Sequence, residues 1–264
     1  MLSAQLLLFL LLLATHARTQ ACVVVEHIPK TSGTSWVKYI QHSLHMRTAP
    51  ICMPDNIYTK TWTHAIAELA SEPNTLYWGH CPLGQKPGGY GTQRCELWTI
   101  LRHPVDRVIS AFYFHHGYDK GPMLDKFRSC IDHICHANRR SHYSNLAVQL
   151  LGYDRPWSQF VEIRKTRFAT RAMLDHAKWR LRNEYKAFAL YERVADSIAL
   201  FSRVFGINTT HDELEFTAHR SSMRRTRADI PSDLIDLIVE KNQLDIELYE
   251  YAVELFDQLM AVHD

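Results

Sequence analysis

The chain has 264 residues, 46% of them hydrophobic and 11% aromatic, so it can bury one sizeable core and is not an intrinsically disordered protein. Its formal net charge of +2 excludes a polycation that binds nucleic acid through overall charge. We therefore expect one domain of catalytic size, in which any anion site arises from local clustering.

The N-terminus carries an apolar run from Leu6 to Ala14 that is short for a membrane span and is followed by small residues. This pattern predicts a signal peptide over residues 1–21, cleaved after Ala17 or Ala21, and a single domain over residues 22–264. A signal anchor retained in a Golgi membrane is the alternative. The expected location is the secretory pathway, either the Golgi lumen or outside the cell.

Entry into that pathway permits disulfide bonds, although the sequence does not settle their pairing. The segment CIDHICH also allows a zinc reading, but no second well-spaced pair of ligands supports it, so no metal is expected. Asn208 begins a glycosylation sequon. The cysteines are Cys22, Cys52, Cys81, Cys95, Cys130 and Cys135.

Four apolar runs, at residues 22–28, 76–78, 97–101 and 187–191, are predicted to be strands. Helical patterns separate them, which favours an α/β fold with a parallel sheet covered by helices on both faces. From residue 195 onward, DSIALFSRVFG, SDLIDLIVEKN and LDIELYEYAVELFDQLM have the apolar spacing of core-covering helices. Two segments, 82–94 and 115–140, are expected to be long irregular loops near strand and helix ends.

The first strand runs into HIPKTSGTSW, which predicts a tight turn before a helix. Gly33 permits a turn that a side chain would obstruct, and Thr34 or Ser35 can cap the helix. Backbone N–H groups, the helix dipole and Lys30 would together hold a phosphate-like anion. The order of lysine and glycine differs from a Walker A loop. An ordinary turn with a solvated lysine is the alternative.

A second candidate anion site lies in LWTILRHPVDRVISAFYF. The strand delivers Arg102 at its end, Pro104 suits the first turn of a helix, and Ser110 lies about two turns along it. A surface arginine and a packed helix serine are the alternative. Two candidate anion sites that follow two strands of one sheet favour the binding interpretation.

These stretches resemble sulfotransferases that use 3′-phosphoadenosine 5′-phosphosulfate (PAPS), specifically the Golgi carbohydrate branch. YSNLAVQLLG, ALYERVADSIALF, RSSMRRTR and NQLDIELYEYAVELF follow in the family's order, over nearly the whole mature chain. AFYFHHGYDKGP and RSSMRRTR most resemble the heparan sulfate and uronyl 2-O-sulfotransferases. The chain departs from those enzymes in its shorter length, in lacking their usual stem, and in His115 and His116, where they tend to have bulkier and basic residues.

The resemblance implies a sulfotransferase fold related to the P-loop nucleotide kinases, and a set of PAPS-binding residues. Lys30 would bind the bridging oxygen between phosphate and sulfate, while Arg102 and Ser110 would bind the 3′-phosphate. Arg220 and Arg227 either join the family's late basic loop or are solvated. The 5′ end would be cradled by Thr31, Ser32, Gly33, Thr34 and Ser35, and the late loop closing over the nucleotide would include Arg224, Arg225 and Thr226.

The resemblance also places a catalytic base at His80, in LYWGHCPLG, with Glu26 or His27 as the alternative base. The reaction implied is sulfuryl transfer by in-line attack to a hydroxyl of a glycosaminoglycan-like glycan, for example the 2-O position of a uronic acid. An acidic polysaccharide could lie on a basic cluster, with Tyr113, Tyr118 and Trp157 lining a sugar groove or belonging to the core. The cluster comprises Arg164, Lys165, Arg167, Arg171, Lys178, Arg180 and Arg182.

Two other functions compete with this one. A nucleotide-dependent kinase could share the strand, loop and helix, but no Walker A lysine or evident magnesium carboxylate supports it. A secreted protein could keep the fold and bind acidic glycans without catalysis. No nucleic-acid partner is expected, and a membrane is involved only if the N-terminal segment is kept as an anchor.

Overall fold

The structure is a computed structural model that describes residues 22–52, 74–80, 95–116, 123–132, 143–153, 169–205 and 225–263. Its centre is a five-stranded sheet in which every neighbouring pair of strands is parallel, in the order β2-β3-β1-β4-β5. This arrangement confirms the predicted α/β class. The strands are β1 (Cys22–Glu26), β2 (Arg47–Cys52), β3 (Thr75–Gly79), β4 (Cys95–Leu101) and β5 (Tyr185–Leu190).

Four of the strands were predicted from their apolar runs, and the structure moves their ends by up to two residues. β2 was not predicted, because RTAPIC begins with a charge and contains Pro50. Its position at the edge of the sheet explains why the proline is tolerated there, since an edge strand leaves one side unpaired. Its pairing with β3 shifts register between Pro50 and Cys52.

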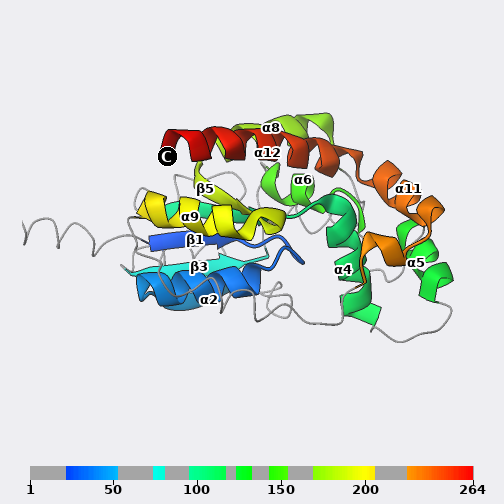
Figure 1. The fold of residues 1–264 in the computed structure, drawn as a ribbon, viewed down its shortest axis with the longest axis horizontal. Coiled ribbons are helices and arrows are strands. Elements are labelled where there is room, and N and C mark those ends of the chain that lie inside the picture. The colour runs from blue at the N-terminus through cyan, green and yellow to red at the C-terminus, as the bar shows by residue number, and fades with distance from the viewer. Residues whose placement is uncertain are drawn as a thin grey trace, which may run out of the picture.

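Eight α-helices lie within the described residues, and Figure 1 shows how they surround the sheet. α8 and α12 pack side by side near β5, while α2 contacts β2 and β3 at the other end of the strand order. α4, α5 and α11 form a group beyond the carboxyl ends of the strands (Figure 1). They are α2 (Gly33–Leu44), α4 (Pro104–His116), α5 (Met123–Asp132), α6 (Leu146–Leu151), α8 (Arg171–Asn183), α9 (Val194–Phe205), α11 (Ser232–Lys241) and α12 (Gln243–His263).

The three helices predicted after residue 195 are confirmed as α9, α11 and α12. The expectation of one long irregular loop over residues 115–140 was wrong, because α5 lies inside it and buries Phe127 and Ile131. The segment 82–94 lies outside the described residues, as do residues 1–21 and Asn208. Among the described helices, none combines the length and the apolar character needed to cross a membrane.

Two hydrophobic clusters hold these elements. The larger one fills the space between the sheet and its covering helices, where Trp36, Trp98 and Phe201 pack with ring centroids 4.9 to 6.4 Å apart. The smaller one joins α4, α5 and α11, with Phe112 stacked on Phe127 at 4.1 Å. Because α4 has this core of its own, it is held firmly at the carboxyl ends of the strands.

Two of the cysteines expected to form disulfide bonds lie in parts of the chain where the structure describes them. Cys95 and Cys130 are both disulfide-bonded. Their pairing is not assigned by the described residues, so the connectivity stays open. A bonded Cys130 also has no thiolate to offer the zinc site considered for CIDHICH.

Candidate active site

The ends of three neighbouring strands meet at one loop, which spans residues 27–32 between β1 and α2. The backbone N–H of His27 donates to the carbonyl oxygen of Gly79 at the end of β3, at 2.8 Å. The His80 Nδ1 lies 2.8 Å from the carbonyl oxygen of His27. From the other side, Nη1 of Arg102, just after β4, donates to the carbonyl oxygen of Lys30 at 3.2 Å. The loop is therefore tied to both neighbouring strands.

The loop turns sharply because two of its residues are left-handed. Lys30 has φ of 72° and Ser32 has φ of 69°. The buried Thr31 hydroxyl donates to the carbonyl oxygen of Ile28 at 2.8 Å, which closes the turn from inside. α2 then begins at Gly33, so the N–H groups at its start face this loop.

The predicted helix cap was wrong. Ser32, not Thr34 or Ser35, occupies the N-cap position, and its side chain makes no capping hydrogen bond. Thr34 and Ser35 lie inside the first turn, and the N–H of Ser35 donates to the backbone oxygen of Ser32 at 3.0 Å. The left-handed Ser32 starts the helix without help from a side chain.

Gly33 is needed for a close approach. A Cβ atom at this position would lie 1.9 Å from Cδ2 of His27, far inside van der Waals contact. The sequence predicted an obstruction at Gly33, and the structure identifies the obstructing group as the His27 ring. The same ring lies 4.2 Å, centroid to centroid, from the ring of His80.

Helix α4 brings Ser110 toward the loop. Phe114, on the last turn of α4, is 62% exposed, and Nζ of Lys30 lies 3.6 Å from the centre of its ring. Ser110 is half-buried four residues earlier, so it shares the face of α4 that carries Phe114. α4 begins at Pro104, as predicted. Arg102 is therefore bonded to the loop, and Lys30 contacts the face of α4 on which Ser110 lies.

The late basic loop is only partly described. Arg225 is exposed, with Nη1 3.8 Å from a carboxylate oxygen of Asp229. Thr226 forms a capping box with the same aspartate, donating to it from N at 2.8 Å and from Oγ1 at 3.0 Å. Arg227 is not simply solvated, because it forms two hydrogen bonds with Asp106 of α4, at 2.9 and 2.8 Å. Arg220 and Arg224 lie outside the described residues.

The histidines beside the loop differ in burial. His27 is 5% exposed, and its pKa is lowered well below the ordinary value, first by burial and then by the nearby His80 and Lys30. The ring is therefore neutral near neutral pH. His80 is half-buried, and a carbonyl oxygen can only accept, so the contact with His27 assigns the proton to Nδ1 of His80. In neutral imidazole, Nε2 is then the basic nitrogen.

Glu26, one of the alternative bases, has another role. Its side chain is buried and accepts from the hydroxyl of Tyr185 and, at 3.3 Å, from Nη2 of Arg180. The Arg180 side chain also donates to the carbonyl oxygen of Leu151 and to Glu184, both at 2.8 Å. Glu26 therefore belongs to a buried ion-pair cluster, which makes it a poor proton acceptor for a substrate.

The structure removes one described member, Arg180, from the predicted basic surface, because its side chain is buried. Arg171 and Lys178 share one carboxylate, Glu247 of α12, and Arg182 donates to the hydroxyl of Tyr251 at 2.8 Å. These last three side chains connect α8 to α12, and their role in binding a polysaccharide stays a prediction. Arg164, Lys165 and Arg167 lie outside the described residues, as do Tyr118 and Trp157, while Tyr113 is buried in the core of α4.

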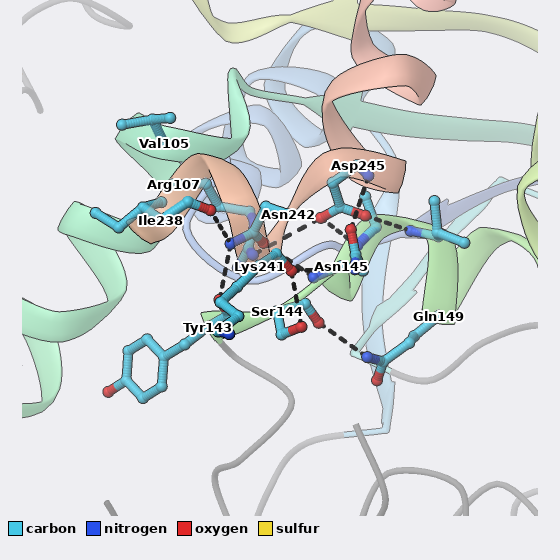
Figure 2. A network of polar contacts seen from close by, with 12 residues as sticks. Val105, Arg107, Tyr143, Ser144, Asn145, Gln149, Ile238, Lys241, Asn242 and Asp245 are labelled. Atoms are coloured by element: carbon cyan, nitrogen blue, oxygen red, sulfur yellow. Dashed lines mark hydrogen bonds and ion pairs between the residues drawn. The ribbon is translucent and has the colours of Figure 1, made fainter. Parts of the chain in front are cut away.

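A buried polar network that was not predicted from the sequence joins α4 and α6 to α12 (Figure 2). Asp245 accepts from the N–H groups of Ala147 and Val148 at 3.0 and 2.8 Å and lies 3.8 Å from Nη2 of Arg107 on α4. Asn145 and Asn242 add further bonds between the start of α6 and the α11–α12 junction. YSNLAVQLLG and NQLDIELYEYAVELF were singled out in the sequence, but only as markers of resemblance.

Burial dominates the electrostatics of this network. It lowers the pKa of Arg107 and raises the pKa of Asp245, and the attraction between the two opposes both shifts. Among the residues that the structure describes, no group of three His, Cys, Asp or Glu side chains is arranged to hold a metal ion.

The chain matches known proteins over most of its length. A model of the sulfotransferase family matches residues 18–252. Human heparan sulfate 2-O-sulfotransferase 1 is 24% identical over 263 residues, which cover 90% of this chain and 71% of that protein. A crystal structure of mouse sulfotransferase SULT7A1 complexed with PAP aligns with a TM-score of 0.41 and 14% identity, over 88% of this chain and 89% of that one. With a family model spanning nearly all of its described sheet and helices, the chain belongs to the sulfotransferase family.

Proposed function

We propose that this sulfotransferase transfers a sulfuryl group from PAPS to a hydroxyl of a glycosaminoglycan-like glycan, such as the 2-O position of a uronic acid, with His80 as general base. The observation that carries the proposal is the junction of three strand ends at residues 27–32. Lys30, His80 and Arg102 reach this loop from β1, β3 and β4, and the last two are hydrogen-bonded to its backbone. PAPS carries negative charge at its 5′-phosphosulfate and at its 3′-phosphate, so its binding requires polar and cationic groups from more than one strand end.

The loop and α2 suit the sulfate end of the donor. The left-handed turn and the first turn of α2 present backbone N–H groups and the positive end of a helix dipole. Lys30 adds a full positive charge beside them. When the bond between sulfur and the phosphate oxygen breaks, these groups would stabilise the negative charge on the departing 3′-phosphoadenosine 5′-phosphate. The residues proposed for this end are Lys30, Thr31, Ser32, Gly33, Thr34 and Ser35.

Arg102 and Ser110 are proposed to bind the 3′-phosphate. Arg102 lies beside the loop, with its guanidinium stacked 4.3 Å over the ring of Tyr191, which orients the planar fork of donors. Ser110 lies on the face of α4 that carries Phe114. The late loop, with Arg224, Arg225 and Thr226, is proposed to close over the nucleotide, and Arg227 fixes its described end to α4.

His80 is proposed to take the proton from the attacking hydroxyl. Its Nδ1–H is held by the carbonyl oxygen of His27, which leaves Nε2 as the basic nitrogen. As the acceptor oxygen bonds to sulfur, its proton passes to Nε2 and the sulfur–phosphate bond breaks. No metal is needed in this scheme, because lysine and backbone dipoles supply the charge stabilisation.

The acceptor class is supported by the relative named for heparan sulfate, whose 24% identity spans most of both chains. A glycan of this class is assembled in the Golgi lumen, so we propose that residues 1–21 deliver the enzyme there, either as a signal peptide or as an anchor. Of the cations that α8 contributes to the predicted basic surface, Arg180 is buried, and Arg171 and Lys178 share Glu247 of α12. The acceptor groove is proposed at the carboxyl ends of the strands, beside Lys30 and His80.

The test is incubation of the purified protein with radiolabelled PAPS and a panel of desulfated glycosaminoglycans. Transfer of label to a uronic-acid-containing chain supports the proposal, and mapping of the labelled disaccharides locates the position. Binding of glycan without transfer would favour a glycan-binding protein, the second candidate. Phosphoryl transfer from ATP to the same panel, without sulfuryl transfer, would favour a kinase.

A further inference from the structure

His27 lies between the proposed base, His80, and the loop of residues 27–32, which we call the donor loop. It is the first residue of that loop, directly after β1, and its ring is packed between Gly33, at the start of α2, and the ring of His80. Its side chain is 5% exposed. The mechanism proposed above uses only its carbonyl oxygen.

The backbone of His27 continues the ladder between β1 and β3. Glu26 pairs with Gly79, and the N–H of His27 then donates to the carbonyl oxygen of Gly79 at 2.8 Å. The carbonyl oxygen of His27 lies 2.8 Å from Nδ1 of His80, the residue that follows Gly79. This contact sets the direction of the His80 imidazole and assigns the proton to its Nδ1.

The ring of His27 acts as a spacer. Because a Cβ at Gly33 would lie 1.9 Å from Cδ2 and 2.1 Å from Nε2, the ring is pressed directly against the backbone of α2. On its other side the ring lies 4.2 Å from His80, with an angle of 36° between the two planes. Its Nδ1 is buried and has no hydrogen-bond partner among the described residues, so no hydrogen bond of Nδ1 holds the ring in this position.

We propose that His27 is a positioning residue, which holds His80 in one tautomer through its carbonyl oxygen and sets the distance between His80 and the donor loop through its ring. This inference rests on the proposed role of His80 as base. Burial keeps the His27 ring neutral, in agreement with its lowered pKa, so it does not compete for the proton that His80 receives.

The contact between His80 and the carbonyl oxygen of His27 becomes stronger during the reaction. When Nε2 of His80 receives the hydroxyl proton, the ring becomes an imidazolium, and its Nδ1–H bond to the His27 carbonyl becomes a charge-assisted hydrogen bond. This interaction is stronger after proton transfer than before it, which is the property required of a group that assists catalysis.

The first experiment compares His27→Ala with His27→Phe. Removal of the spacer should lower kcat by about 10- to 100-fold, since a displacement of the order of 1 Å at a reacting group has that effect. The dissociation constant for 3′-phosphoadenosine 5′-phosphate, measured by calorimetry, should change by less than about threefold. His27→Phe keeps a flat ring of similar size and should keep kcat within about threefold of the wild type. Phe188→Leu, in β5, controls for loss of a buried ring elsewhere and should leave kcat unchanged.

The second experiment measures the tautomer of His80 directly, by the ¹⁵N chemical shifts of its ring, assigned by comparison with His80→Ala. The wild type and His27→Phe should show a proton on Nδ1 alone. His27→Ala keeps the carbonyl oxygen but loses the ring that holds His80 in place beside it, so this variant should show a mixture of tautomers. A merely structural role for His27 would not change this signal. The proposal is overturned if His27→Ala keeps both the single tautomer and a kcat within about twofold of the wild type.

A double-mutant cycle tests the spacer without any assay of activity. Gly33→Ala should destabilise the wild-type protein, because the new Cβ meets the His27 ring, and should cost much less in a His27→Ala background, where that ring is gone. Equal costs in both backgrounds would contradict the contact. If His27→Ala alone does not fold, the double variant Gly33→Ala/His27→Ala can replace it, because the new methyl group partly fills the cavity left by the ring. If His80→Ala proves active, the proposed base is wrong, whereas the tautomer and the cycle still test the role of His27.

Discussion

Replacement of Glu26 by glutamine distinguishes between two candidate bases. Glu26 ends β1, directly before the donor loop, so its position alone is compatible with catalysis. Its carboxylate is buried and engaged by Arg180 and Tyr185, while its backbone oxygen accepts from Thr99 at 2.8 Å. Glu26→Gln should therefore lower stability and leave turnover nearly unchanged.

The expected loss in free energy of unfolding of Glu26→Gln follows from the contacts of Glu26 with Arg180 and Tyr185. At 3.3 Å and an effective dielectric constant of about 20, the attraction between Glu26 and Arg180 is about 5 kcal/mol. Desolvation offsets part of this, and loss of one partner of a buried pair costs about 3–5 kcal/mol. Glutamine keeps an oxygen for the Tyr185 hydroxyl, and Arg180 keeps Glu184, so we expect the lower end, about 3 kcal/mol. For a domain of this size, the melting temperature should fall by about 6–12 °C.

The assay combines thermal unfolding, followed by circular dichroism, with turnover measured well below the transition. Glu184→Gln is the matched control: it removes a less buried partner of the same arginine and should cost only about 1 kcal/mol. Turnover of both variants should stay within about threefold of the wild type. A Glu26→Gln protein with unchanged stability and turnover reduced by about 100-fold or more would show that Glu26 acts in the chemistry and that His80 is not the base.

Further variants test the remaining assignments. Lys30→Ala should lower kcat by at least about 100-fold, because the leaving phosphate loses its charge partner, and near-normal activity would exclude the site. His80→Ala should lower kcat by about 10²- to 10⁴-fold with donor affinity retained, and loss of donor binding would make it a cofactor or structural residue instead. Phe114→Leu removes the ring under Lys30 and should lower kcat/KM about two- to fivefold, with Phe114→Tyr as control, and an unchanged value would remove any role for the contact. Asp245→Asn should cost about 3 kcal/mol in thermal unfolding, because Arg107 loses its carboxylate partner, and an unchanged transition would show that the pair contributes nothing.

The strand, loop and helix around Lys30 could be predicted because their signals are local. An apolar β-branched run, a proline and a glycine describe β1 and the turn within about a dozen residues, and the structure places them as expected. The cap was misassigned for a reason that is also local: Thr34 and Ser35 have good capping side chains, but the left-handed Ser32 begins the helix two residues earlier. The start of α2 was therefore set by the backbone conformation of Ser32 and not by the capping preference of a side chain.

Other features depend on contacts between distant residues and could not be predicted. Arg180 has the same helical spacing as the exposed cations of α8, and only the packing of α8 against Leu151 and Glu26 shows that it is buried. Asp245 similarly belongs to an amphipathic pattern in which acids are usually solvated. Its partners on α6 lie 97 and 98 residues away in the chain, and single-sequence periodicity contains no information about such pairs.

The placement of α4 explains why late parts of the chain matter to a site built from its first half. Arg107 and Ser110 lie one turn apart, the first buried against Asp245 of α12 and the second on the face that carries Phe114. Asp106, next to Arg107, holds Arg227 and so the described end of the late loop. A shift of α12 or of the late loop must therefore move the helix that carries Ser110, whereas Lys30 and His80 are held by strand ends. Changes in these late segments should weaken donor binding before they affect proton transfer.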